Sequence, residues 1–234
     1  MPKRRVASRP ETPKPMLVRA AAKTLTISAA DFLPKDQSLP RLRQASHGCR
    51  GCDLWKNATQ TVFGEGNPGS TVMMVGEQPG DKEDRAGRPF VGPAGAVLDK
   101  ALDVAGIDRE RVYVTNIVKH FKWTPKGRMR IHKKPGTRQI AACRPWLDAE
   151  LRTVRPRIVV CLGSTAAQAL LGKDFKVTQQ RGEFIEKDGT LFTATVHPSS
   201  ILRSPDDESR HREMDLLVGD LKKVAGILRE RRAA

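Results

Sequence analysis

The chain has 234 residues, enough for one sizeable α/β domain with tails, and two full domains are not expected. It carries 42 Lys and Arg against 26 Asp and Glu, and its formal charge of +16 suits a polyanionic partner such as nucleic acid. Charge alone also fits a ribosome-associated or non-specifically adhesive protein. No apolar run reaches the roughly 20 residues of a membrane span, and the amino terminus lacks an apolar signal core. We therefore expect a soluble, cytoplasmic protein without a membrane partner.

The first 23 residues are rich in lysine, arginine and proline, and Glu11 is their one acid. This composition predicts a disordered basic tail over residues 1–23, which either adds nonspecific DNA affinity or has no role of its own. Residues 24–234 are predicted to form a single domain.

Strands and helices are predicted to alternate through this domain. Four apolar runs predict strands at Thr71–Val75, Val112–Asn116, Arg157–Leu162 and Leu191–Val196. Helical periodicity predicts helices over Ala96–Ala105, Arg138–Thr153 and Thr165–Leu171, followed by an amphipathic packing helix from Met214 to Leu228. The alternation indicates an α/β fold, a three-layer αβα sandwich around a central, mostly parallel four-stranded sheet.

The segment from Gly76 to Gly95 is rich in glycine, proline and acidic residues and follows the first predicted strand. Ligand crevices of open α/β sheets lie at the carboxyl ends of their strands, so we expect this segment to form a wall of an active site. Its GEQPGD and PFVG motifs resemble the first motif of the iron-sulfur uracil-DNA glycosylases. Glu83 and Asp84, between these motifs, are interpreted as turn residues. A dinucleotide site is disfavoured because no G-x-G-x-x-G follows the strand.

Two further motifs extend the resemblance. The segment Arg128–Lys133, RMRIHK, lies in a predicted basic loop and resembles the KRRIHK-like loop of the UdgX class, from which it departs at Arg128 and Met129. In that class the loop histidine attacks the sugar and stays bonded to the DNA, a role that falls here on His132. VHPSS, from Val196 to Ser200, is similar to the closing motif of the family. The resemblance implies a uracil-DNA glycosylase fold.

The same resemblance assigns catalytic and base-binding roles. Glu77 stabilises the sugar cation and orients His132, while His197 hydrogen-bonds a uracil carbonyl oxygen as negative charge develops there. Phe90 stacks on the flipped base, and Asn116 offers its amide to the pairing edge. Two more residues, Gln78 and Asp81, are assigned to the uracil pocket.

Contacts with the DNA backbone are expected from the basic loop and from the segment after the closing motif. The residues assigned to them are Arg128, Arg130, Lys133, Lys134, Ser199, Ser200 and Arg203. The alternative for His132 is a plain DNA-binding loop, in which the histidine contacts only phosphate.

The four cysteines are Cys49, Cys52, Cys143 and Cys161. Thiolates bind soft metal centres, and a four-cysteine set fits either zinc or a [4Fe–4S] cluster. The resemblance implies a structural [4Fe–4S] cluster on all four. Two other interpretations remain: buried thiols beside an incidental Cys-x-x-Cys, and disulfides, which are less expected without a secretion signal.

Three functional hypotheses follow. The first is a uracil-DNA glycosylase that becomes covalently linked to its abasic product through His132. The second is a turnover glycosylase of the family-4 type, in which water attacks the sugar. The third is a noncatalytic single-stranded DNA-binding module. High salt would release the DNA from such a module, because salt screens its phosphate contacts. The expected partner is uracil-containing DNA, preferably single-stranded, and the protein is expected to act as a monomer.

Overall fold

The computed structural model describes residues 27–233 and the side chains of residues 27–230. The predicted basic tail at 1–23 lies outside the described residues. The strands are Val72–Gly76 (β1), Val112–Asn116 (β2), Trp123–Lys126 (β3), Met129–His132 (β4), Ile158–Leu162 (β5), Ile185–Lys187 (β6) and Thr190–Thr195 (β7). The α-helices are Leu39–Ser46 (α1), Asp81–Ala86 (α2), Pro93–Ala105 (α3), Thr137–Val154 (α4), Ser164–Leu171 (α5), Val177–Gln180 (α6), Pro198–Leu202 (α7) and Asp207–Ala233 (α8). Short 3₁₀ helices are Ala29–Phe32 (η1), Asp53–Lys56 (η2) and Arg109–Arg111 (η3).

The main sheet has five strands in the order β2-β1-β5-β7-β6. The four predicted strands are β1, β2, β5 and β7, all parallel, and each begins and ends within one residue of its predicted bounds. The fifth strand, β6, pairs antiparallel with β7 at the edge and was not predicted. It is only three residues long and has no apolar run, but the Asp188-Gly189 turn that follows it has φ of 49° and 75°, typical of a tight hairpin.

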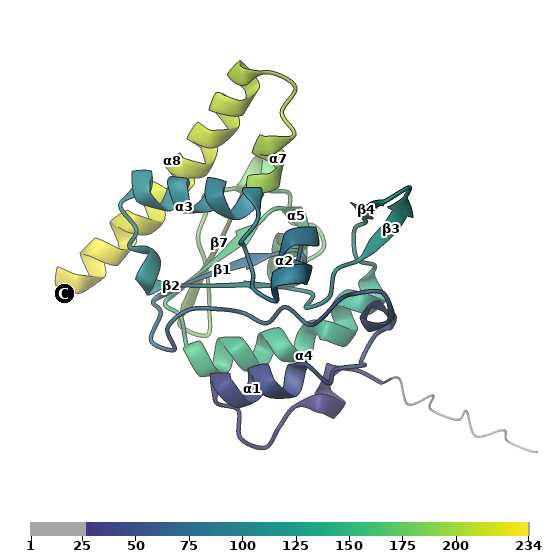
Figure 1. The fold of residues 1–234 in the computed structure, drawn as a ribbon. Coiled ribbons are helices and arrows are strands. Elements are labelled where there is room, and N and C mark those ends of the chain that lie inside the picture. Colours follow the sequence, from purple (N-terminus) through teal and green to yellow (C-terminus); the bar gives the residue numbers. More distant parts are fainter. Residues whose placement is uncertain (1–26, 234) are drawn as a thin grey trace, which may run out of the picture.

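Helices cover both faces of this sheet (Figure 1). Alternate residues of each strand point to opposite faces, so Met73 and Val75 pack with α1, α4 and α5, whereas Val72 and Met74 pack with α3, α7 and α8. The predicted three-layer αβα sandwich is therefore confirmed. None of the described helices is long and apolar enough to span a bilayer.

A second, two-stranded sheet is the main departure from the predicted arrangement. The segment predicted as a basic loop forms the antiparallel hairpin β3–β4, in which Trp123 pairs with His132 and Gly127 turns with φ of 58°. Figure 1 shows the hairpin projecting from the main body of the molecule. His132 is thus the last residue of a strand, placed at the base of the hairpin and not at its tip.

A fully buried ion pair lies beneath the carboxyl end of β2. Lys119 Nζ lies 2.5 Å from Glu150 Oε2, and both side chains are 0% exposed. The ammonium also donates to Thr115 Oγ1 at 2.6 Å and to the carbonyl of Asn116 at 2.7 Å. Glu150 in turn accepts hydrogen bonds from the Gly64 N–H and the Thr115 hydroxyl. Each charge is compensated, which a buried charge requires.

Lys119→Met is expected to lower the free energy of unfolding by about 3–5 kcal/mol, because it leaves the Glu150 carboxylate buried without a cation. Urea denaturation measures the loss. The double variant Lys119→Met/Glu150→Gln removes both charges and keeps an acceptor for Gly64, so it should recover part of that stability. If the double variant is no more stable than Lys119→Met, burial of an unpaired charge is not the cause of the loss.

Candidate active site

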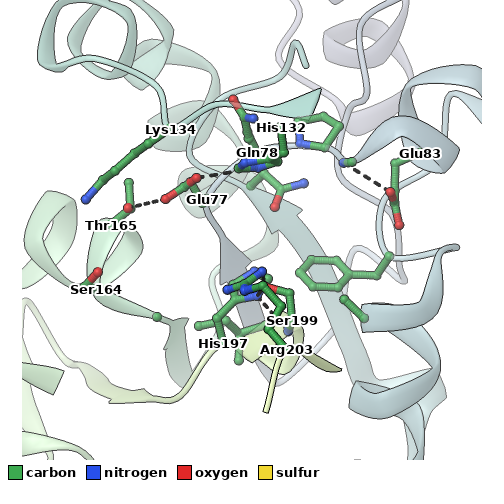
Figure 2. Close-up of a pocket in the computed structure, with 17 residues that line it drawn as sticks. Glu77, Gln78, Glu83, His132, Lys134, Ser164, Thr165, His197, Ser199 and Arg203 are labelled. Atoms are coloured by element: carbon green, nitrogen blue, oxygen red, sulfur yellow. Dashed lines mark hydrogen bonds and ion pairs between the residues drawn. The ribbon is translucent and has the colours of Figure 1, made fainter. Parts of the chain in front are cut away.

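A pocket of about 590 Å³ lies at the carboxyl ends of β1, β2, β5 and β7, the position expected for an open α/β sheet. Figure 2 shows His132 and His197 on opposite sides of it. Of the residues predicted for the site, those that line the pocket are Glu77, Gln78, Phe90, Asn116, His132, Lys134, His197, Ser199 and Arg203. Three motifs far apart in the sequence therefore meet in one cavity.

Glu77 connects His132 to the start of α5 (Figure 2). One carboxylate oxygen, Oε1, lies 3.7 Å from His132 Nε2. The other, Oε2, accepts a short hydrogen bond from the Thr165 hydroxyl. Thr165 was predicted only as the first residue of a helix, although its place one residue after the Gly163-Ser164 turn at the end of β5 puts it at the same sheet edge as the site. The hydroxyl holds the carboxylate so that its free oxygen faces the imidazole.

The imidazole of His132 is half-exposed at the pocket wall. Burial lowers its pKa, as does the nearby Arg203 cation, and the Glu77 carboxylate only partly opposes this. The net pKa lies below the ordinary 6.5, so the ring is neutral at physiological pH and carries a free nitrogen lone pair. A neutral imidazole of this kind is a competent nucleophile.

His197 is held as a hydrogen-bond donor to the pocket. Burial, with Arg203 and His132 nearby, lowers its pKa to about 4, so the ring is neutral. Its Nδ1 accepts the Ser199 N–H at 3.1 Å, which assigns the ring proton to Nε2. The Nε2–H group is therefore available to stabilise negative charge on a ligand oxygen.

Phe90 and Asn116 also form part of the pocket wall. The Phe90 backbone has φ of 56°, an uncommon conformation for a bulky residue, and its ring lies 6.5 Å from the His197 ring in a stacked arrangement. None of the hydrogen bonds among the described residues involves the Asn116 side-chain amide, so its donor and acceptor remain available. A Cβ at Gly76 would collide with the Asn116 amide oxygen and the Phe90 ring, which explains the glycine at the end of β1.

Glu83, interpreted from the sequence as a turn residue, is instead a buried residue of α2 that lines the pocket. Its two carboxylate oxygens accept the N–H groups of Gly92, at 2.7 Å, and Gly80, at 3.1 Å. The carboxylate thus ties the residue that precedes α2 to the end of the loop that carries Phe90. The interpretation as a turn residue was wrong because the acid's partners are backbone groups on both sides of α2.

Asp84 is likewise a buried helix residue, and it anchors the hairpin through Arg130. Arg130 Nη1 donates to Asp84 Oδ2 at 2.6 Å, and its Nε makes a short contact with Asp81 Oδ1. The guanidinium also lies over the Phe121 and Trp123 rings, at 5.4 and 5.5 Å from their centroids. With a side chain only 13% exposed and two carboxylates on it, Arg130 positions the hairpin and is not free for the predicted phosphate contact.

Two residues assigned to the uracil pocket hold the hairpin in place, and one of them, Gln78, also lines the pocket. Gln78 Nε2 donates to the carbonyls of Lys122 and Lys133, both at 3.1 Å, and its Oε1 accepts the Lys122 N–H. Both ends of the Gln78 amide are therefore occupied by the chain on either side of the hairpin. Asp81 does not line the pocket; its carboxylate pairs with Arg85 and Arg130.

The remaining residues assigned to DNA fall into two groups. Arg128, Lys133 and Lys134 are exposed and have no acidic partner among the described contacts, and Lys134 reaches the pocket. Ser199 lies between His197 and Arg203, which donates to its hydroxyl at 3.0 Å. Ser200 does not line the pocket, and its hydroxyl donates to the His197 carbonyl.

The structure does not bring the four cysteines together. Burial raises the pKa of the Cys143 thiol to about 12, and Cys52 and Cys49 are close enough to raise it further. Burial alone raises the pKa of Cys161 to about 12, and the one charge that acts on it is Lys187, not a cysteine. Two N–H groups donate to the sulfur atoms of Cys49 and Cys143. Trp146 Nε1 donates to Cys49 Sγ at 3.2 Å, and the Lys119 backbone N–H donates to Cys143 Sγ at 3.3 Å.

Among the described residues no three His, Cys, Asp or Glu side chains converge on a single ion. A cluster of several metal atoms is wider than one ion, so its ligands stand farther apart. Cys49, Cys52 and Cys143 fit three positions around such a group, with N–H donors to sulfur that iron-sulfur sites use. Cys161, within β5, shows no such proximity to another thiol, because Lys187 is the one charge that acts on its pKa.

Comparison with known proteins identifies the family. The model of the uracil DNA glycosylase superfamily matches residues 63–222, which include every residue that lines the pocket. The type-4 uracil-DNA glycosylase of Thermotoga maritima is 36% identical over 184 residues, 78% of this chain and 90% of that protein. That of Sulfurisphaera tokodaii is 35% identical over 178 residues, 72% of this chain and 77% of that protein.

A type-5 uracil-DNA glycosylase from Pyrobaculum aerophilum is more distant, at 32% identity over 182 residues, 69% of this chain and 77% of that protein. The sheet order, the pocket at the carboxyl ends of the strands and these matches agree. The chain belongs to the uracil DNA glycosylase superfamily.

Proposed function

We propose that this protein excises uracil from DNA, preferably single-stranded DNA, and becomes covalently bonded to the resulting abasic sugar through His132. The observation that carries the proposal is the position of a neutral His132 imidazole 3.7 Å from Glu77, across the pocket from His197. The relatives named as type-4 uracil-DNA glycosylases support the excision of uracil. Unpaired strands suit a pocket of this kind because extrusion of the nucleotide then costs least.

The first step is cleavage of the bond between uracil N1 and sugar C1′. The extruded uracil stacks on Phe90, and the Asn116 side-chain amide forms hydrogen bonds with the pairing edge of the base. As the bond breaks, its electron pair moves onto the uracil ring, and His197 Nε2–H donates to the carbonyl oxygen that gains negative charge. A donor already fixed by Ser199 needs no reorganisation in the transition state.

The second step is capture of the sugar cation. The Glu77 carboxylate faces the positive charge on the sugar, and the free lone pair of His132 attacks C1′ to form a carbon–nitrogen bond. The alkylated imidazole loses its N–H proton while the uracil anion gains one, so charge and atoms balance. Placement of the imidazole beside the sugar gives it a large effective concentration over water.

We also infer that a [4Fe–4S] cluster is bound by Cys49, Cys52 and Cys143, and that Cys161 is not one of its ligands. The cluster would supply structural crosslinking, because these cysteines join the loop before η2 to α4. The chemistry at the sugar uses only residues of the pocket.

The test of function is incubation with a uracil-containing single-stranded oligonucleotide, followed by heat, detergent and a denaturing gel. The parent protein is expected to give a band shifted by the mass of the oligonucleotide. His132→Ser should give no shifted band but should still release uracil, because the smaller side chain admits water to C1′. Release of uracil by the parent without a heat-stable adduct would establish the turnover glycosylase instead, and salt-reversible binding without uracil release would establish the binding module.

Thr165→Val is expected to slow adduct formation roughly 10- to 100-fold, because the carboxylate of Glu77 loses a hydrogen bond to a charged group. Single-turnover gel assays measure the rate. The valine side chain has nearly the same shape as threonine, so the melting temperature should change little. Thr165→Ser keeps the hydroxyl and serves as the matched control, with a rate close to that of the parent. A Thr165→Val rate equal to the parent's would show that the hydroxyl does not orient Glu77.

Cys143→Ala should abolish iron binding and the visible absorbance of the purified protein, whereas Cys161→Ala should retain both. Iron analysis and absorbance spectra of the two variants make the comparison, and the two residues are matched because both are buried thiols. Loss of iron from Cys161→Ala with an unchanged melting temperature would contradict the inferred ligand set.

A further inference from the structure

A second surface with the chemistry of a nucleic-acid contact lies beside the hairpin, outside the pocket. It consists of Arg50, Trp55 and Lys56, from the Cys-x-x-Cys loop and η2, together with Trp123 of β3, and is called here the η2 surface. Trp55 is 36% exposed, and the Arg50 guanidinium lies 4.8 Å from the centroid of its ring. Neither Trp123 nor η2 belongs to the pocket lining.

A strand pairing and a hydrogen bond connect this surface to the proposed nucleophile, His132. Trp123 is the pairing partner of His132 across the hairpin. Its indole Nε1 donates to the carbonyl of Asn57, the residue that ends η2, at 2.9 Å. The η2 surface therefore begins at the strand next to His132 and continues onto the loop that carries Cys49 and Cys52. Figure 1 shows the hairpin leaving the main body above this loop.

The cations of the η2 surface are not neutralised by neighbouring acids. Among the described contacts, neither Arg50 nor Lys56 has a carboxylate partner, and the same holds for Lys126 and Arg128 on the hairpin. On the opposite side of the Phe90 loop the arginines are paired, Arg88 with Glu65 and Arg109 with Asp99. The one acid of η2, Asp53, accepts a hydrogen bond from Gln139. The unpaired cations beside the hairpin therefore attract phosphates to this part of the surface.

Exposed aromatic rings favour contact with single-stranded over double-stranded DNA. Bases without a partner strand can stack on indole rings or on a guanidinium plane, whereas bases inside a duplex present only their edges. An exposed cation–π pair such as that of Arg50 and Trp55 is weak, on the order of 0.5–1 kcal/mol, so a base can take the place of the guanidinium.

We propose that the η2 surface binds the nucleotides that flank the extruded uracil on one side, by stacking of a base on Trp55 and contact of phosphates with Arg50 and Lys56. The proposal rests on the proposed function, because the pocket must hold the flipped uracil of the same strand. It adds a substrate preference: strands that extend past the pocket over the hairpin should bind more tightly than short ones.

The experiment measures dissociation constants by fluorescence anisotropy with oligonucleotides that contain 2′-fluoro-deoxyuridine. The fluorine destabilises the sugar cation, so the base is not excised and binding is separated from chemistry. Three substrates are compared: one of about four nucleotides, and two of about sixteen that extend only 5′ or only 3′ of the uracil. Trp55→Ala is expected to weaken binding of one extended substrate roughly 5- to 50-fold and to leave the short substrate unchanged.

Trp55→Phe keeps a ring and should retain most of the affinity. Arg50→Ala should weaken binding of the same extended substrate and lower the slope of log affinity against log salt concentration by about 1. Because Arg50 is exposed, this change should not disturb the core. The matched basic control is Arg229→Ala, near the exposed carboxyl end of α8 and far from the hairpin (Figure 1), which should bind all three substrates as the parent does.

Equal affinities of Trp55→Ala, Arg50→Ala and the parent for both extended substrates would overturn the proposal. So would an equal loss on the short and extended substrates, since that result assigns these residues to stability or to the pocket. Failure of the proposed function is distinguishable: it would show as absence of uracil release and of adduct with ordinary deoxyuridine, whatever the dependence of binding on length.

Discussion

The nearly buried guanidinium of Arg130 is the central anchor of the hairpin β3–β4. The hairpin does not belong to the main sheet, and its two strands are short and mostly exposed. Arg130 joins it to Asp84, a fully buried carboxylate that also accepts the Thr59 N–H, and to Asp81. Removal of one partner from such a pair costs about 3–5 kcal/mol in typical cases, so the position of His132 depends on these contacts.

The contacts around the hairpin explain how His132, the proposed nucleophile, can be held in place on a small exposed element. The Gln78 amide fixes the chain on both sides of the hairpin, and Gln78 follows directly after Glu77. The carboxylate that faces the sugar and the clamp that places the imidazole therefore come from neighbouring residues at the end of β1. A shift of the hairpin would move His132 relative to Glu77, and misplacement by about 1 Å is enough to cost a large factor in rate.

Much of the main sheet could be predicted from the sequence because its parallel strands are buried on both faces and read as continuous apolar runs. β6 was missed because it is a short edge strand, although the Asp-Gly turn beside it was a usable signal. The hairpin was missed because Pro125 and several charged residues obscure its alternation. The pocket motifs located the site, and His132, Glu77 and His197 do meet in it.

Partners distant in sequence could not be predicted. Nothing near Arg130 in the chain indicates that its charge is satisfied by α2, so it was assigned to phosphate. Gln78 was assigned to the uracil pocket and Glu83 was interpreted as a turn residue, but three-dimensional packing gives their polar atoms backbone partners. Thr165 carried no local signal beyond its place at the start of a helix. The four cysteines were grouped by number, and only the fold separates Cys161 from the others.

The most direct test of the covalent mechanism is mass spectrometry of the protein–DNA adduct after digestion with protease and nuclease. The peptide containing His132 is expected to carry the sugar and phosphate of the nucleotide that lost its uracil, bonded to an imidazole nitrogen. Attachment at Lys134, whose amine also reaches the pocket and can form an imine with an opened abasic sugar, would contradict this mechanism. So would an unmodified peptide together with free abasic DNA.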